Sequence, residues 1–240
     1  MLHVLGFVAF PVLAGIAGGA LAAFRPPGPR LASAVQHFAA GVVFAAVAVE
    51  ILPGMSHGAH LSEVVVGFVV GVALMLTLGA WERRAEQAAE ASAAFPTAAL
   101  IAVGLDLVID GFLIGVGFIA GEKEGLLLTF ALTLEVLFLG LSVAALLGRS
   151  GATAGTILLT TGGLSLLTAV GAVASATIGP SLSPPMLVGV LSFGCAALLY
   201  LVTEELLVEA HEATPDSSWR TAMFFVGFLL VILLDLEGAG

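Results

Sequence analysis

Two acidic residues four positions apart lie inside a long apolar stretch. Asp106 and Asp110 fall in the segment GLDLVIDGFLIGVGF, which contains no lysine or arginine. Residues four apart project from the same face of a helix, so both carboxyl groups should point the same way. A carboxylate in hydrocarbon costs a few kcal/mol or more. A proton, a cationic partner or a metal ion must therefore offset that cost.

A third acid, Glu135, stands midway along the next apolar stretch, TFALTLEVLFLGLSV. The break GEKEG between the two stretches is short, so the two helices should run antiparallel. Asp110 precedes that break by about ten residues and Glu135 follows it by about ten, which at 1.5 Å per residue places both at the same depth. The three acids therefore predict one metal or proton site. Protonated acids that line a polar hole are the alternative.

The composition is that of an integral membrane protein. Of the 240 residues, 60% are hydrophobic and 10% are charged, against about a quarter charged in soluble domains, and the mean hydropathy is +1.16. Apolar runs of about 20 residues without alternation predict helices rather than a barrel. The net charge of −10 disfavours a nucleic-acid partner and suits cation handling. A single cysteine, Cys195, excludes an intrachain disulfide and is typical of a packing residue.

Turn residues and charges divide the chain, read as one transmembrane domain over residues 1–240, into eight predicted spans. The spans cover about 2–24, 31–52, 64–81, 95–120, 125–147, 152–178, 186–208 and 219–236. The first span lacks a basic leader, so we expect it to be retained rather than cleaved. Loops are expected between the spans, including PGMSHGAH, ERRAEQAAEAS and GEKEG.

The basic residues predict the orientation of the spans. Six of the seven bases fall in the odd-numbered loops: Arg25, Arg30, Arg83, Arg84, Arg149 and Arg220. The even loops hold only Lys123, between Glu122 and Glu124. By the positive-inside rule the odd loops are expected to be cytoplasmic and both termini to lie outside. The expected location is a bacterial inner membrane.

Two further groups of polar residues lie at span ends. A candidate exit, toward the predicted cytoplasmic side, comprises Glu204, Glu205, Glu209 and His211. A candidate entrance, on the opposite side, comprises Glu50, His57, His60 and Asp235. Solvated helix ends and solvated loop histidines are the alternative for both groups.

Three stretches in order resemble the ZIP (Zrt-/Irt-like) family of divalent metal transporters. DLVIDGFLIGVGF is similar to the family's fourth-span motif, TLEVLFLGLSV to its fifth-span acid motif, and LYLVTEELLVEAHE to its seventh-span motif. The resemblance implies an eight-span bundle with inverted three-span repeats around spans 4 and 5. It also implies a homodimer. In the transport cycle that the resemblance implies, spans 1, 4, 5 and 6 move as a unit against spans 2, 3, 7 and 8.

The chain departs from the family pattern where a second metal would bind. Leu107 stands where the family has an asparagine. Leu132 stands where the family has a polar residue, three positions before the fifth-span acid, and Leu166 stands at about the position of the family's sixth-span glutamate. What remains is one site of carboxylate oxygens, formed by Asp106, Asp110 and Glu135. Oxygen ligands favour harder ions such as Mn²⁺ or Fe²⁺ over a histidine-rich zinc site.

The sequence thus predicts a transporter, not an enzyme, which carries Zn²⁺, Cd²⁺, Mn²⁺ or Fe²⁺ inward as its substrate and holds no cofactor. An intramembrane aspartyl protease is disfavoured, because its two aspartates must face each other from different helices. A metal-binding sensor that does not transport, and a pathway for protons or monovalent cations, remain as alternatives.

Overall fold

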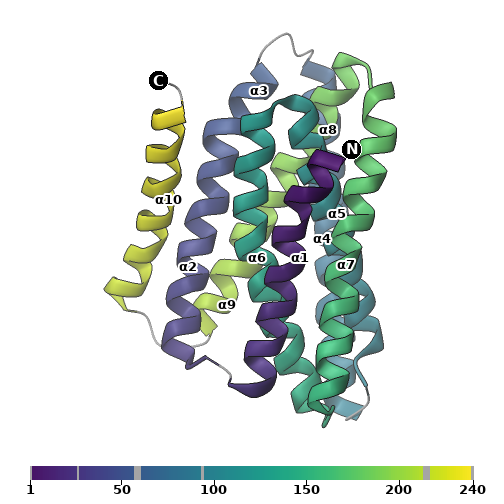
Figure 1. Ribbon diagram of the computed structural model, residues 1–240, viewed down its shortest axis with the longest axis vertical. Helices are drawn as coiled ribbons and strands as arrows, with labels where there is room; N and C mark the ends of the chain where they lie inside the picture. Colours follow the sequence, from purple (N-terminus) through teal and green to yellow (C-terminus); the bar gives the residue numbers. More distant parts are fainter. Residues whose placement is uncertain (1, 26, 57–60, 93–94, 213–216, 239–240) are drawn as a thin grey trace. The chain divides into compact units, whose positions relative to one another are not determined.

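A computed structural model describes residues 2–25, 27–56, 61–92, 95–212 and 217–238, and every regular element in these ranges is helical (Figure 1). Eight of the helical stretches are long and apolar enough to cross a membrane. The elements of the first half are α1 (Leu2–Phe24), α2 (Pro29–Ala46), η1 (Val47–Ile51), α3 (Leu52–Ser56), α4 (Leu61–Ser92) and α5 (Thr97–Ala120). Those of the second half are α6 (Glu122–Arg149), α7 (Ala154–Ile178), η2 (Gly179–Ser181), α8 (Pro184–Tyr200), η3 (Leu201–Leu206), α9 (Leu207–Glu212) and α10 (Ser218–Gly238).

The number of spans agrees with the prediction, but three expected loops are partly or wholly helical. ERRAEQAAEAS continues α4 to Ser92, because alanine, glutamate, arginine and glutamine favour helix and no glycine or proline interrupts them. The break GEKEG is reduced because α6 already begins at Glu122. Leu52–Ser56 is the short helix α3, and 57–60, with both candidate histidines of that loop, lie outside the described residues.

The helices form two compact units. Unit 1 comprises Met1–Pro26, Leu74–Val116 and Leu132–Pro180, and unit 2 comprises Pro27–Ala73, Gly117–Ala131 and Ser181–Gly240. Spans 1, 4, 5 and 6 thus contribute most of their length to unit 1, and spans 2, 7 and 8 to unit 2. The third span is divided at Leu74, and 117–131, the end of the fourth span and the start of the fifth, belong to unit 2.

In unit 1, α1 packs along α7, while α5, α6 and α7 enclose the core. A cluster of buried apolar side chains joins these three helices and includes Leu107, Val136 and Ile157. Helices α5 and α7 approach closely because glycines face backbone carbonyls on both sides. A β-carbon on Gly111 would collide with the carbonyl oxygen of Thr168, and one on Gly171 with that of Val108. Small residues permit such close crossings in membranes.

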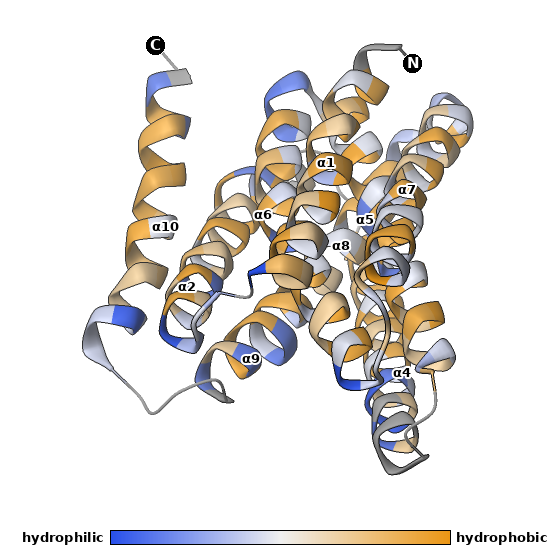
Figure 2. Ribbon diagram, turned by 60° about the horizontal axis from the view of Figure 1, so that its bottom comes forward, coloured by the Kyte–Doolittle hydropathy of each residue, from blue (hydrophilic) through white to orange (hydrophobic). Residues whose placement is uncertain are grey.

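In unit 2, α2 and α10 lie side by side (Figure 1). Gly41 packs against the backbone of Phe224, and Gly227 packs against that of Phe38. The ring of Phe44 lies 5.9 Å from that of Phe224. Figure 2 shows hydrophobic residues along most of α10, with hydrophilic ones near its two ends. This is the distribution expected of a helix with its middle in hydrocarbon.

Two of the spans contain a π-helical segment. η1 follows α2 directly and carries Glu50, while η3 follows α8 and carries Glu204. π-Helical segments are uncommon in proteins, and those that occur are often found at functional sites. The span that carries Asp110 has no such segment, because α5 is a regular helix from Thr97 to Ala120, and Gly111 packs against the backbone of Thr168.

Candidate metal centre

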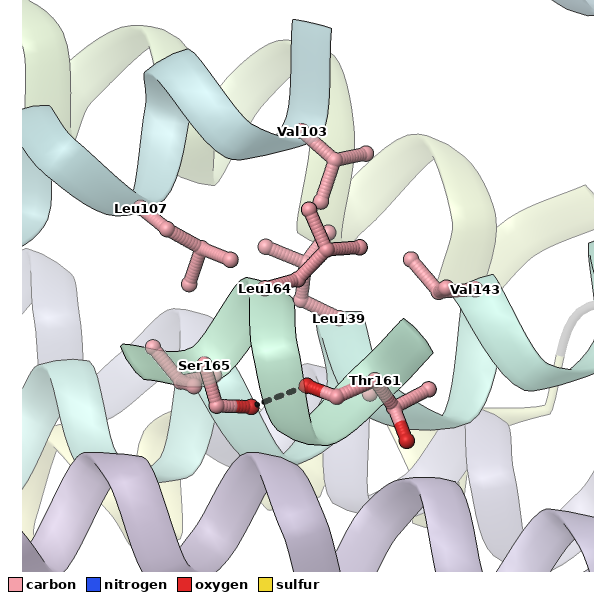
Figure 3. A pocket seen from close by; sticks show the side chains of 9 residues that line it. Val103, Leu107, Leu139, Val143, Thr161, Leu164 and Ser165 are labelled. Atoms are coloured by element: carbon pink, nitrogen blue, oxygen red, sulfur yellow. Dashed lines mark hydrogen bonds between the residues drawn. The ribbon is translucent and has the colours of Figure 1, made fainter. Parts of the chain in front are cut away.

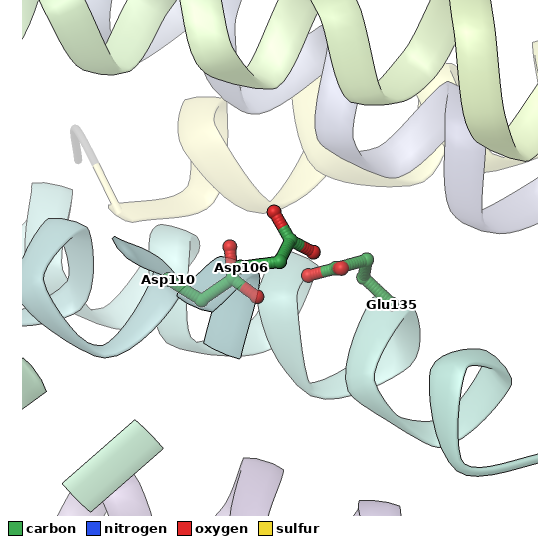
Figure 4. A group of neighbouring side chains, drawn as sticks. All are labelled: Asp106, Asp110 and Glu135. Atoms are coloured by element: carbon green, nitrogen blue, oxygen red, sulfur yellow. The ribbon is translucent and has the colours of Figure 1, made fainter. Parts of the chain in front are cut away.

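The three acids predicted to form one site come together inside unit 1. Asp106 and Asp110 stand one turn apart on α5, Glu135 projects from α6, and all three are buried. One carboxylate oxygen from each lies within 4.8 Å of the others. Figure 4 shows the three side chains pointing toward one another. The three acids are thus brought together across two neighbouring helices.

The negative charges of three buried carboxylates at this spacing would need to be neutralised. Oδ2 of Asp110 is buried and accepts no hydrogen bond from the residues that the structure describes. Carboxylates this close together cannot all carry a full charge in a low dielectric, because like charges and desolvation both disfavour ionisation. The site must therefore hold protons, or a cation in their place. A cation that binds here would release protons as it does so.

The surroundings of the acids are apolar on the side of Leu107. A cavity of about 10 Å³ lies between α5, α6 and α7, bounded by Leu107, Leu139, Leu164 and others (Figure 3). The hydroxyl of Thr161 donates to Ile157 O at 2.9 Å, and that of Ser165 donates to Thr161 O at 2.8 Å. This space holds about one water at most, and no acidic, histidine or cysteine side chain lines it. The cavity is therefore too small and too apolar to hold a hydrated cation.

Two of the candidate entrance residues, Glu50 and Asp235, share one cationic neighbour. Glu50, 6% exposed, lies 3.7 Å from Nζ of Lys123. The same ammonium group forms an ion pair with Asp235. The lysine thus joins η1, α6 and α10 within unit 2 and occupies the position between the two acids where a cation was expected.

The candidate exit residues lie on η3 and α9 in unit 2. Glu204 is exposed and Glu205 is half-buried. Glu209 accepts a hydrogen bond of 2.6 Å from Nε2 of Gln36. His211 stacks edge-on against His37, with 4.9 Å between the ring centroids. Glu209 and His211 thus contact α2, and both are exposed, as is Glu204 on η3.

Gln36 and His37 were missed by the sequence analysis. Both are buried, at 6% and 3% exposure. The signal was present, because QH is an adjacent polar pair within the predicted second span, followed by the apolar run FAAGVVFAAVAV. A polar residue inside a membrane span indicates a functional site by default.

The chain matches no model of a known protein family, and no curated protein matches it significantly. The chemistry of the site therefore rests on its own residues. Three carboxyl groups supply hard, anionic oxygen ligands, which suit divalent cations such as Mn²⁺ and Fe²⁺ and accept Zn²⁺ or Cd²⁺ less selectively.

Proposed function

We propose that this protein transports a divalent transition-metal cation across a bacterial inner membrane toward the cytoplasm. The observation that supports the proposal most directly is the convergence of Asp106, Asp110 and Glu135, all buried and with one oxygen each within 4.8 Å. An acid buried in a span is costly unless it has a role or a partner. Three such acids around one point are suited to a dication.

In the proposed cycle the cation sheds most of its water and replaces protons on the three carboxyl groups. Three carboxylates around a dication leave a net charge of −1. Either one of the acids keeps its proton, or the occupied site carries one negative charge. Each binding event is then coupled to proton release. Release would lead toward Glu204, Glu205 and Glu209, whose carboxylates can attract the departing ion.

The similarity to ZIP transporters supports a mode of movement. The α1, α5, α6 and α7 helices would move as one body with the bound ion, in an elevator-like step, against the helices of unit 2. Most of the length of these four helices belongs to unit 1, together with the second part of α4. The same similarity supports inverted repeats, termini on the outer side and a homodimer.

The proposal is tested by uptake of Zn²⁺, Cd²⁺, Mn²⁺ and Fe²⁺ into proteoliposomes. We expect saturable uptake for at least one ion, and its loss in Asp110→Asn, which keeps the shape of the side chain but removes its charge. The loss should exceed about 100-fold in metal affinity, since removal of an outer-shell partner alone already costs 10–100-fold. Glu237→Gln, which removes an exposed acid from α10, is the matched control and should leave uptake unchanged.

Each contrary outcome identifies a different alternative. Metal binding without uptake of any ion would indicate a sensor. Uptake of protons or Na⁺ that requires Asp110, without metal uptake, would indicate a pathway for monovalent ions. Stoichiometric metal binding that survives Asp110→Asn would overturn the assignment of the site.

A further inference from the structure

Two histidines from distant parts of the sequence meet in unit 2. His37 lies on α2 and His211 on α9, and these helices pack together. Their rings are 4.9 Å apart between centroids, at an interplanar angle of 64°. His37 is 3% exposed, whereas His211 is open to solvent. The pair therefore has a buried side and a side accessible to a hydrated ion.

Both rings are held in the same tautomer. Nδ1 of His37 lies 2.8 Å from the carbonyl oxygen of Ser33, and Nδ1 of His211 is hydrogen-bonded to that of Leu207. A carbonyl oxygen can only accept, so each Nδ1 must carry the hydrogen. In the neutral imidazole this leaves the lone pair on Nε2. Metal-binding histidines are oriented in this way, with one ring nitrogen donating to a carbonyl and the other facing the metal.

The second ring nitrogen of His37 has no partner. Its Nε2 is buried and makes no hydrogen bond within the described part of the chain. An unsatisfied buried polar atom costs about 1–3 kcal/mol. Two imidazoles that share a tetrahedral ion at 2.0–2.1 Å have ring centroids about 5 Å apart. The measured 4.9 Å is close to this spacing.

Neighbouring contacts fix the two helices at this position and add negative charge. The Ser33 hydroxyl donates to Ala210 O at 2.7 Å. Gln36 Nε2 donates to the Glu209 carboxylate at 2.6 Å. On each helix the residues that form these two bonds lie within four positions of the histidine. The bonds hold α2 against α9. The Glu209 carboxylate also raises the local concentration of cations.

We propose that His37 and His211 form a second metal site, for one borderline divalent ion of the zinc class. Two imidazole nitrogens are its protein ligands, and water completes the coordination. The ligand set is nitrogen-based, unlike the carboxylate oxygens of the centre in unit 1. A site with only two protein ligands exchanges its ion readily. The inference does not depend on transport, because it rests on contacts within unit 2 alone.

The site is tested by metal binding to purified protein in which the first centre has been neutralised by Asp110→Asn and Glu135→Gln. Equilibrium dialysis with Zn²⁺ and with Cd²⁺ should find about one equivalent bound in this background. His211→Gln should remove it. His211 is exposed, so its replacement should leave the fold intact, and circular dichroism with gel filtration checks each protein. His3→Gln is the matched control and should leave binding unchanged.

A spectroscopic variant adds an independent readout. His211→Cys should retain Cd²⁺ and produce a cadmium–thiolate absorption band in the ultraviolet, because a thiolate is a strong ligand for soft and borderline ions. Absence of binding in the neutralised background, or equal binding in His211→Gln, would overturn the proposal and leave the pair as a packing contact. Both results are independent of whether Asp110 is needed for uptake.

Discussion

At the scale of single residues, Lys123 has the least expected position. It was predicted to lie in an even loop, where bases are scarce, but it lies in the first turn of α6. Its ammonium group pairs with the buried Glu50 and with Asp235. The two acids alone suggested an attraction for incoming cations. The lysine neutralises part of that charge, so an incoming cation would meet a weaker negative potential unless the ion pairs open.

Removal of the lysine should destabilise the protein because it leaves Glu50 buried without its cation. For Lys123→Met we expect a loss between ~1 kcal/mol, the value for exposed pairs, and ~3 kcal/mol, that for buried ones. The Lys123 side chain is 42% exposed, which favours the lower part of the range. Thermal unfolding in detergent measures the loss. The double variant with Glu50→Gln should lose less than the two single variants added together, and simple additivity would contradict the pairing.

At the scale of helices, close contact between α5 and α7 positions the acids. Gly111 follows Asp110 directly, and its α-carbon faces the backbone carbonyl of Thr168. A side chain there would separate the two helices. Because Asp110 is the neighbouring residue, any displacement of α5 would also move its carboxyl group away from Glu135.

Gly111→Ala should therefore reduce both stability and metal binding. Overpacking of this kind costs about 1–3 kcal/mol, and the obstacle is backbone that cannot rotate aside. Gly163→Ala is the matched control, because a β-carbon there meets nothing within 4 Å, and its stability should stay within about 0.5 kcal/mol of the parent. Thermal unfolding and metal titration of both variants provide the measurement. Equal behaviour of the two would contradict the close crossing.

At the scale of the whole molecule, the distribution of bases predicts how the chain is threaded through the membrane. Six of the seven bases lie in odd loops, so those loops should face the cytoplasm. With eight helices long enough to cross a membrane, this orientation would place both termini on the outer side, which stays a prediction.

Cysteine labelling in intact cells tests this orientation. In a Cys195→Ser background, Glu122→Cys in the fourth loop region should react with a membrane-impermeant maleimide. Gly28→Cys and Ala152→Cys, in the first and fifth loop regions, should react only after the cells are opened. The reverse pattern would place the termini inside and reverse the proposed direction of transport.

The number of spans and the three acids were predictable because each depends on short stretches of sequence. A run of about 20 apolar residues indicates a span by itself. Residues four apart share a helix face, and a short loop forces antiparallel neighbours of matched depth. These rules placed Asp106, Asp110 and Glu135 together. The helical continuation to Ser92 was misjudged because its charged residues were taken to mark a loop, although they favour helix.

Contacts between helices distant in the sequence were decided only by the tertiary structure. The Ser33 and Ala210 contact, which brings His37 near His211, spans 177 positions, and no local pattern indicates which helices pack side by side. Lys123 pairs with Glu50 and Asp235 for the same reason. Hydropathy and helical periodicity fix the depth and the face of a residue. Its partner depends on the packing of small residues and backbone between particular helices, which only the folded chain determines.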